Sequence, residues 1–263
     1  MIDIHHHLLW DQDDGSTSLE LSIEMAQMAA EDGITHIACT PHSNGYYTYI
    51  PETIDAKIAK LQRMLEQEKI PITLGRGCDF HTSYDNIQHA RVEPRRFSLN
   101  GGAYLLVEIP DHALPPTLNE VFYQMQLDGL IPILTHPERN LTLQKDMSRI
   151  KDWLRSGVLV QVTAGSVMGR MGRTAQRIAH ELLAKNWVHF LATDAHNTTS
   201  RPPQMRAAME LVAEKYNPEY AHLLCISNPL AAFTDKPMPV QPEMLDLYED
   251  STPKSWWQRL TGR

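Results

Sequence analysis

The sequence predicts an α/β fold in which helices cover a parallel sheet, and three observations lead to this prediction. The chain has 263 residues, a length that suits one large α/β domain with a hydrophobic core. Short apolar runs alternate with helical patterns along most of that length. Histidine and acidic residues gather at the carboxyl ends of the predicted strands. Because these ends open onto one mouth in a closed barrel, this third observation favours a barrel over an open sheet.

Seven short runs rich in apolar and β-branched residues predict seven strands. Helical patterns separate them, so the strands should run parallel with helices as the connections. The predicted strands are residues 1–4, 35–39, 72–75, 103–109, 131–135, 158–162 and 189–192.

Helix candidates lie between these strands. A capping box of Thr17 and Glu20 is predicted to open the first helix, and Gly33 to close it. Its apolar stripe consists of Leu19, Ile23, Ala26 and Ala30. Further helices are predicted around residues 54–65, 118–128, 146–155, 175–183 and 204–215.

The pattern of strands and helices stops near residue 235. We therefore expect a barrel over residues 1–235, followed by an extended linker and tail over residues 236–263. The tail carries Trp256 and Trp257 beside basic residues. It is predicted to be either a free tail or a segment that docks a partner or a membrane surface.

Composition excludes several classes of protein. The formal net charge of −8 argues against a nucleic-acid surface, which needs a basic stripe to neutralise phosphates. No apolar run is long enough to cross a membrane, and Met1 leads directly into a strand without a signal peptide. Three widely spaced cysteines fit reduced thiols. We expect a cytoplasmic protein.

Two pairs of residues predict a metal site. Side chains alternate along a strand, so His5 and His7 point to the same side while His6 points to the other. Asp194 and His196 repeat this spacing after the last predicted strand. Burying unpaired charge is costly, so two such pairs at one mouth favour bound cations. His6 is predicted to be an ordinary core or surface residue.

The remaining candidate ligands also follow strands. His42, Asp79, Glu108 and His136 each lie at the carboxyl end of a different predicted strand. Asp14 lies in an acidic turn, where a turn carboxylate and a ligand are equally good interpretations. These positions predict a multinuclear site.

Mixed histidine and carboxylate ligands suit manganese, iron or zinc better than a closed structural zinc site. Two to three divalent ions are expected, with manganese first and iron, zinc or magnesium as alternatives. Cations held there would activate water for attack on phosphorus, so no covalent enzyme intermediate is needed. Arg139 and Arg201 follow His136 and His196. Each could bind phosphate oxygens or form a surface salt bridge, and the family resemblance described below favours phosphate binding.

Other phosphatase chemistries lack their residues. A cysteine-dependent phosphatase needs an arginine six positions after its thiolate, whereas Cys39, Cys78 and Cys225 are followed there by Gly45, Tyr84 and Ala231. The chain also has no Gly-Lys-Ser/Thr phosphate loop.

The ordered series of motifs resembles the polymerase and histidinol phosphatase (PHP) superfamily. Within it the chain is most similar to the capsule-type bacterial tyrosine-protein phosphatases, from Met1 to about Phe233. The motifs are the opening Met-Ile-Asp-Ile-His-His-His, Asp13-Asp14-Gly15, Thr40-Pro41-His42, Glu108, His136-Pro137-Glu138-Arg139, Asp194-Ala195-His196-Asn197 and Arg201-Pro202.

The resemblance implies a distorted (β/α)7 barrel of PHP type with a trinuclear metal centre. It also implies a division of the ligands, in which Asp79 bridges the first two ions. The three sets are His5, His7 and Asp194; Glu108 and His136; and Asp14, His42 and His196. The family usually has Glu where this chain has Asp79, so the bridge must come from a closer backbone or with help from His81.

The resemblance and the ligand series together predict a metal-dependent phosphomonoesterase that acts on phosphotyrosine in a protein. The expected partner is the tail of a bacterial tyrosine kinase that governs capsule or exopolysaccharide production. A phosphatase for a small molecule such as histidinol phosphate is one alternative. Another is a barrel without activity that binds phosphorylated tails. An amidohydrolase would normally have a bridging Lys where this chain has Glu108.

Overall fold

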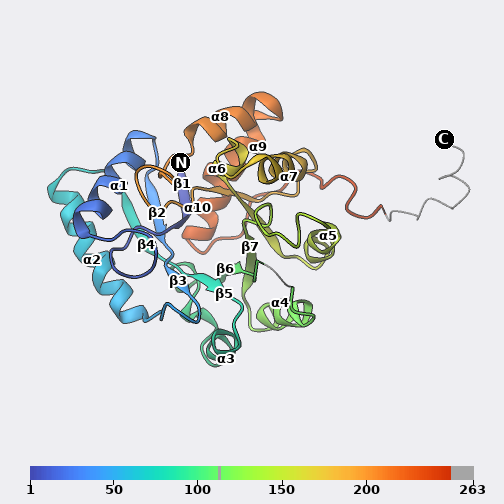
Figure 1. Cartoon of the computed structure of the whole chain (residues 1–263), viewed down its shortest axis with the longest axis horizontal. Coiled ribbons are helices and arrows are strands. Elements are labelled where there is room, and N and C mark those ends of the chain that lie inside the picture. The colour runs from blue at the N-terminus through green and yellow to red at the C-terminus, as the bar shows by residue number, and fades with distance from the viewer. Residues whose placement is uncertain (112–113, 250–263) are drawn as a thin grey trace, which may run out of the picture.

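The computed structural model describes residues 1–111 and 114–249, in which parallel strands form a closed ring with helices outside (Figure 1). Two sheets, with strand orders β1-β2-β4 and β3-β5-β6-β7-β8-β9, make up the ring. A parallel bridge between His6 and Ala195 joins β1 to the chain just after β9. The strands are β1 Ile2–His6, β2 His36–Cys39, β3 His42–Ser43, β4 Thr73–Arg76, β5 Asp79–His81, β6 Tyr104–Glu108, β7 Ile131–Thr135, β8 Leu159–Thr163 and β9 Phe190–Ala192.

These nine segments make up seven strands, because two strands are interrupted near their middle. Only Thr40 and Pro41 separate β2 from β3, and only Gly77 and Cys78 separate β4 from β5. Pro41 has no N–H to donate to a ladder. Backbone hydrogen bonds of 2.9 Å from Gly77 and 3.1 Å from Asp79 still join the two interrupted strands. The seven-stranded, distorted barrel predicted from the sequence is therefore confirmed.

The first strand is longer than predicted and contains a bulge. It continues through His6, so His5 lies within the strand and not beyond its end. Asp3 and His6 pair with Ile37 and Cys39 of β2, which leaves one extra residue in β1. A bulge reverses the side-chain alternation. As a result, His5 faces the opposite side of the sheet from Asp3.

Helices connect the strands and cover the outside of the barrel. Most of the predicted helices form close to their expected positions. The α-helices are α1 Leu19–Glu31, α2 Pro51–Gln67, α3 Tyr84–Val92, α4 Leu118–Leu127, α5 Ser148–Arg155, α6 Ala164–Val167, α7 Arg173–Ala184, α8 Arg206–Lys215, α9 Pro218–His222 and α10 Asn228–Phe233; the short turns η1 Pro94–Arg96 and η2 Leu99–Gly101 and the π-helical turn η3 Leu223–Ser227 complete the set.

The start of α1 differs from the prediction. Ser18, and not Thr17, is the N-cap, and its hydroxyl accepts a hydrogen bond of 3.1 Å from the N–H of Leu21. The predicted capping box is wrong by one residue, since Ser18 stands beside Thr17 and Ser is the better N-cap of the two. Gly33 follows the helix with a φ of +90°, as a residue in the left-handed region should.

The sequence did not indicate α3 or the run of short helices from α9 to α10. The apolar stripe of α3 is weak, because only Asn86 and Ala90 of this helix are buried. The run from α9 to α10 is apolar on most sides, so it lacks the one-sided pattern by which a surface helix is identified.

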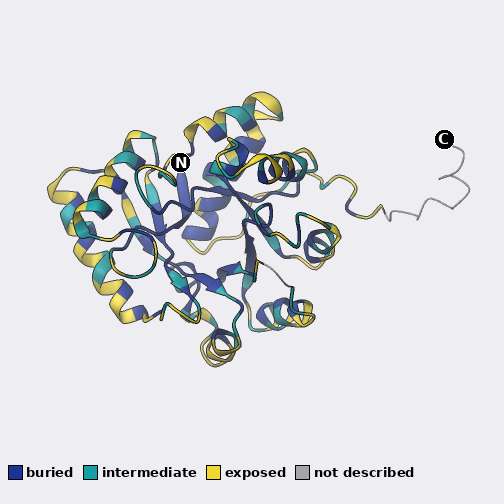
Figure 2. Cartoon of the chain, in the orientation of Figure 1, coloured by how far each residue is buried: buried dark blue, intermediate teal, exposed yellow. Residues whose placement is uncertain are grey.

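Two core clusters fill the molecule. Leu105 of β6 and Leu191 of β9 belong to the larger cluster, which contains the buried faces of the outer helices. Their neighbours Leu106 and Ala192 belong to the smaller cluster together with Phe233 of α10. Neighbouring strand residues point to opposite faces, so the smaller cluster fills the barrel and α10 packs against it. Figure 2 shows this arrangement as buried strands with helices exposed only on their outer faces.

Residues 236–249 form an extended segment, which we call the strap, and it lies against the barrel. Leu245 donates its N–H to the carbonyl of Lys185 at 2.9 Å, and Trp187 donates its indole N–H to the carbonyl of Leu245 at 2.9 Å. Leu247 is buried in the larger core cluster. Trp256 and Trp257, on which the prediction of tail docking depends, lie outside the described residues. Among the described helices, none is both long and apolar enough to cross a membrane.

Candidate metal centre

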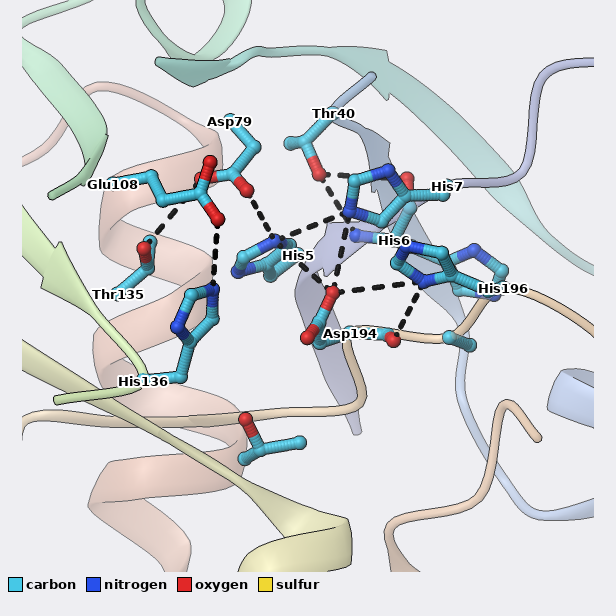
Figure 3. A network of polar contacts seen from close by, with 12 residues as sticks. His5, His6, His7, Thr40, Asp79, Glu108, Thr135, His136, Asp194 and His196 are labelled. Atoms are coloured by element: carbon cyan, nitrogen blue, oxygen red, sulfur yellow. Dashed lines mark hydrogen bonds and ion pairs between the residues drawn. The ribbon is translucent and has the colours of Figure 1, made fainter. Parts of the chain in front are cut away.

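Histidine and acidic side chains from six of the seven strands meet at the carboxyl-end mouth of the barrel. Figure 3 shows this cluster without His42 and Asp14. Among the described residues they form four groups whose ligand atoms lie within 4.8 Å of one another. All nine side chains predicted as metal ligands are members, and no other described residue is. The groups are His5, His7 and Asp194; His5, Asp79 and His136; His42, Asp79 and Glu108; and His7, Asp14, His42 and His196.

The first group is fully buried. The Nε2 atoms of His5 and His7 lie 3.4 and 3.2 Å from Oδ1 of Asp194. Figure 3 shows both rings directed toward this carboxylate. This is the set that the resemblance assigns to one ion.

Asp79 lies between two groups. Its Oδ2 atom is 3.5 Å from Nε2 of His5 and 3.1 Å from Nδ1 of His42. Glu108 approaches from the neighbouring strand, with Oε1 3.9 Å from Nε2 of His136. The shorter Asp side chain thus reaches the middle of the cluster from the interrupted strand. His81, considered as an assistant to Asp79, belongs to none of the groups.

The third group lies nearer to solvent. Oδ1 of Asp14 is 3.4 Å from Nε2 of His42 and 3.5 Å from Nε2 of His196. The Asp14 side chain is 53% exposed, whereas His196 is buried. His7 joins this group as well as the first, because its ring lies only 3.8 Å from that of His196.

Three histidines have their second ring nitrogen fixed by a partner. Nδ1 of His5 is 3.0 Å from Oε1 of Gln161, and Nδ1 of His7 is 2.6 Å from Oδ2 of Asp13. Nδ1 of His196 is 3.0 Å from the carbonyl oxygen of Asp194. With the proton on Nδ1, each Nε2 presents a lone pair to the cluster. Such partners are typical of histidines that bind metals.

Two cluster residues have a left-handed backbone conformation. The φ angles are +52° at Asp194 and +34° at His136. Such conformations are unfavourable for residues other than Gly and concentrate at functional sites. Behind Asp194, the carboxylate of Asp3 accepts the N–H of Thr193 at 3.0 Å and its hydroxyl at 2.5 Å. These hydrogen bonds fix the turn that carries Asp194.

The pKa values show how strong the negative field in the cluster is. Burial alone lowers the pKa of His5, but Asp79 and Asp194 beside it raise that pKa to about 9. Burial likewise opposes protonation of His42, yet Asp79 and Glu108 raise its pKa to about 10. Burial together with the charge of Asp79 raises the pKa of Glu108 to about 8. The carboxylates and histidines of the cluster therefore interact strongly with one another.

The two predicted phosphate-binding arginines also reach the mouth. Arg139 and Arg201 both form an ion pair with Oδ2 of Asp194, on the opposite side from the two histidines. Their side chains are 27% and 24% exposed, so both remain partly open to solvent while they neutralise Asp194.

None of the three cysteines can serve as a nucleophile. Cys39, Cys78 and Cys225 are free and buried. Burial raises the pKa of each thiol above its ordinary value; nearby acids add to this effect, and the amino terminus opposes it only at Cys225. A neutral, inaccessible thiol does not attack phosphorus.

Asp13, Asp3 and the role of Gln161 were not identified from the sequence. Asp3 could have been identified as a structural residue, because it lies inside an apolar strand and a buried acid needs hydrogen-bond partners. Asp13 and Asp14 are adjacent residues of the same type. Only the conformation of the turn decides that Asp14 joins the cluster and that Asp13 supports His7.

The loop after His42 carries Tyr46, Tyr47 and Tyr49, which from their position could flank a planar phosphotyrosine ring or pack locally. In the structure Tyr47 stacks on His42, Tyr49 packs beside Phe97, and Tyr46 is exposed.

His6 is a further surprise. It is fully buried, and neither ring nitrogen has a hydrogen-bond partner among the described residues. The backbone N–H of His6 donates to the hydroxyl of Thr40 at 2.9 Å, which ties β1 to the interruption between β2 and β3.

Comparisons with known proteins agree with this geometry. The family model for capsular polysaccharide synthesis proteins of the CpsB/CapC type matches residues 1–234. The tyrosine-protein phosphatase YwqE of Bacillus subtilis (strain 168) is 32% identical over 247 residues, covering 92% of this chain and 97% of the relative. The tyrosine-protein phosphatase CpsB of Streptococcus pneumoniae is 26% identical over 243 residues, covering 90% and 99%.

Solved structures are similar as well. One comes from work on YwqE of Bacillus subtilis and CpsB of Streptococcus pneumoniae, described as unique metal-dependent tyrosine phosphatases. It aligns with a TM-score of 0.86 at 32% identity, covering 93% of this chain and 98% of that one. A β-aspartyl dipeptidase from Fervidobacterium islandicum-AW-1 aligns with a TM-score of 0.57 at 15% identity, which shows a shared fold alone.

Proposed function

Because the chain belongs to the CpsB/CapC family of capsular polysaccharide synthesis proteins, we propose that it is a metal-dependent protein-tyrosine phosphatase. The observation that carries the proposal is the convergence of nine histidine and acidic side chains, with two arginines, at one mouth. Its substrate would be phosphotyrosine in a protein, as the names of the relatives imply for those proteins. A bacterial tyrosine kinase that governs capsule production is the proposed partner. Free, buried cysteines support a cytoplasmic location.

The donor atoms fit divalent cations. All are imidazole nitrogens or carboxylate oxygens, a mixture that suits manganese first and iron, zinc or magnesium next. Oδ2 of Asp79, Nδ1 of His42 and Nε2 of His196 are buried, and their ion-pair contacts with one another and with Asp14 lack the geometry of hydrogen bonds. Buried polar atoms without partners are costly unless a ligand binds them.

We propose that two to three ions are held by sets that follow these groups. Asp79 is proposed to bridge the first two sets, because it belongs to a group with His5 and to one with Glu108. The sets are His5, His7 and Asp194; Glu108 and His136; and Asp14, His42 and His196.

Bound divalent cations would supply Lewis acidity that activates water and neutralises charge on the phosphoryl group. The protein's own side chains perform the positioning. Gln161 and Asp13 hold the His5 and His7 rings with Nε2 toward the cluster. Arg139 and Arg201 are proposed to bind phosphoryl oxygens, because their guanidinium groups flank Asp194 at the mouth.

Loading and removal of metal test the proposal. Manganese-loaded protein should release phosphate from a phosphotyrosyl peptide, and complete chelation should abolish this activity. His136→Ala or Asp194→Ala should lower kcat/KM more than about 100-fold, beyond the loss typical of residues that only support a ligand. His222→Ala is the matched control, because His222 is exposed and belongs to none of the metal-ligand groups.

Thiol alkylation should leave the activity unchanged, since the three cysteines are buried. Turnover that persists after all metal has been removed would disprove this chemistry. Faster turnover of histidinol phosphate than of the peptide would favour a small-molecule phosphatase. Tight peptide binding without turnover would favour a binding module.

A further inference from the structure

A cleft of about 310 Å³ lies beside the metal-ligand cluster. The loop over residues 43–50 forms one side of it, and the first half of α3 with Arg96 and Phe97 forms the other. We call it the side cleft. Its volume is at the lower end of the range for small-ligand sites, so it suits one or two amino-acid residues and not a whole protein surface.

The side cleft shares a wall with the cluster. Tyr47 lines the cleft, and its ring stacks on that of His42 at a centroid distance of 6.1 Å and an interplanar angle of 15°. Ser43, the residue after His42, lines it too. A substrate with its phosphoryl group at the cluster therefore has the cleft next to it, on the His42 side of the mouth.

Hydrogen bonds hold this wall in place without a ligand. The buried Asn86 side chain donates to the carbonyls of Ser43 at 2.6 Å and His81 at 2.9 Å, and it accepts the Ser43 hydroxyl at 3.0 Å. The Asn44 side chain accepts the backbone N–H groups of Tyr46 and Tyr47 at 2.9 and 3.0 Å. The cleft is thus preformed, which lowers the entropic cost of binding.

The lining combines aromatic and polar groups. Tyr49 and Phe97 are buried, with ring centroids 5.3 Å apart. The Tyr49 hydroxyl is buried and has no hydrogen-bond partner among the described residues. His89, Arg96 and Asp85 provide the polar part of the lining. The lining contains both a positive side chain, Arg96, and a negative one, Asp85, so the cleft does not select for a strongly charged ligand.

These features fit a stretch of polypeptide better than a second phosphate. An apolar or aromatic side chain can pack on the partly exposed ring of Tyr47, while peptide groups use the polar atoms. Resting on the proposed function, we propose that the side cleft binds the residue adjacent to phosphotyrosine in a peptide substrate and so selects phosphopeptides over small phosphate esters.

Gly45 allows a clean test. It is exposed in the 43–50 loop and lines the cleft, and a Cβ added to it would meet no heavy atom within 4 Å. Gly45→Trp should therefore be tolerated without straining the backbone, and from this lining position its indole is long enough to reach into the cleft. Gly45→Ala adds a side chain too small to fill it and serves as the matched control.

Steady-state kinetics of the manganese-loaded protein should be measured with p-nitrophenyl phosphate and with a phosphotyrosyl peptide that has Phe on both sides of the phosphotyrosine. Gly45→Trp should raise KM for the peptide about tenfold, the effect of losing one well-packed side chain. Its kcat and KM for p-nitrophenyl phosphate should stay within about twofold of wild type, and Gly45→Ala should match wild type on both substrates.

An unchanged ratio of the two kcat/KM values in Gly45→Trp would overturn the side-cleft assignment. Equal losses on both substrates would also overturn it, because they would indicate a disturbed metal site. If wild type hydrolyses neither substrate, the proposed function fails and this inference fails with it. If wild type hydrolyses p-nitrophenyl phosphate but shows no preference for the peptide, only the side-cleft assignment is rejected.

Discussion

At the scale of single residues, the cluster depends on side chains that do not belong to it. Asp13 is the clearest case, because its carboxylate is fully used. One oxygen accepts the N–H of Gly15 at 3.0 Å, and the other accepts His7 Nδ1 at 2.6 Å and the N–H of His42 at 2.9 Å. The interaction with His7 overcomes the effect of burial and lowers the pKa of Asp13 to about 2. Asp13 thus orients one ring of the cluster and positions the backbone of a second.

Replacing Asp13 with Asn should disturb this arrangement. An amide has only one acceptor oxygen, so either Gly15 or the His7 side would face an NH₂ group. We expect Asp13→Asn to lower manganese affinity and kcat/KM by about 10- to 100-fold, the usual effect of losing a partner of a metal ligand. Metal titration and peptide kinetics would measure both quantities.

The neighbouring Asp11→Asn is the matched control for this variant. Asp11 is exposed and has a φ of +49°, a conformation that Asn tolerates well. It should behave like wild type. If Asp13→Asn also binds manganese and turns over peptide as wild type does, the orienting role of Asp13 is wrong.

At the scale of elements, the closure between β1 and β9 is the decisive contact. A short set of backbone hydrogen bonds makes this seam, including Asp194 N–H to the carbonyl of His5 at 2.8 Å and His7 N–H to the carbonyl of Ala195 at 2.9 Å. The seam brings the two predicted pairs of ligands together. The Asp3 carboxylate adds a side-chain link to Thr193 across the same seam.

Removing the Asp3 carboxylate should weaken the seam. Asp3→Ala leaves the N–H and hydroxyl of buried Thr193 without acceptors and should lower the free energy of unfolding by about 3 kcal/mol. Asp3→Asn keeps one acceptor oxygen and should lose only about 1 kcal/mol. Urea unfolding of the metal-free proteins would give both values. Equal stability of Asp3→Ala and wild type would show that this link contributes nothing.

The elements also show what a strand pattern can and cannot predict. Most helices and the seven strands could be predicted because each carries a one-sided or continuous apolar pattern. The bulge in β1 could not, since it depends on how β1 pairs with β2 and not on any residue type within β1. The interruptions at Thr40-Pro41 and Gly77-Cys78 were missed for a related reason. Each is a change in how one strand pairs with the neighbouring strand, and the residues of a single strand do not specify that pairing.

At the scale of the whole molecule, the strap packs against the barrel, although it comes after all the ligand motifs in the sequence. Figure 1 shows the chain leaving α10 and passing the α7 and α5 side of the barrel before the end of the described residues. Arg155 donates its Nε–H to the carbonyl of Leu247 at 2.8 Å, and Leu247 itself is 4% exposed. By contrast, Val240 of the same strap is 93% exposed.

This contrast predicts unequal effects of truncating two side chains in the strap. Leu247→Ala should lower the free energy of unfolding by about 2–4 kcal/mol, because it leaves a cavity in the core. Val240→Ala should change that free energy by less than about 0.5 kcal/mol. Neither variant should change kcat on the phosphotyrosyl peptide. Denaturant titrations would measure the difference, and a similar small effect of both changes would show that the strap is not part of the stable core.

The sequence by itself determined the seven-stranded α/β barrel, most of its helices and eight of the nine side chains that meet at the mouth, whereas Asp14 was assigned by the family resemblance. It could do so because apolar periodicity sets the elements and because the carboxyl ends of parallel strands must share one end of a closed barrel. Only the tertiary structure decided that Asp13 supports His7 while Asp14 faces the cluster, that His5 turns inward through a bulge, that Asp3 braces the turn before Asp194, and that the side cleft exists. Each of these depends on which backbone groups come within hydrogen-bonding distance across the chain, and residue type and spacing along the sequence do not encode that distance.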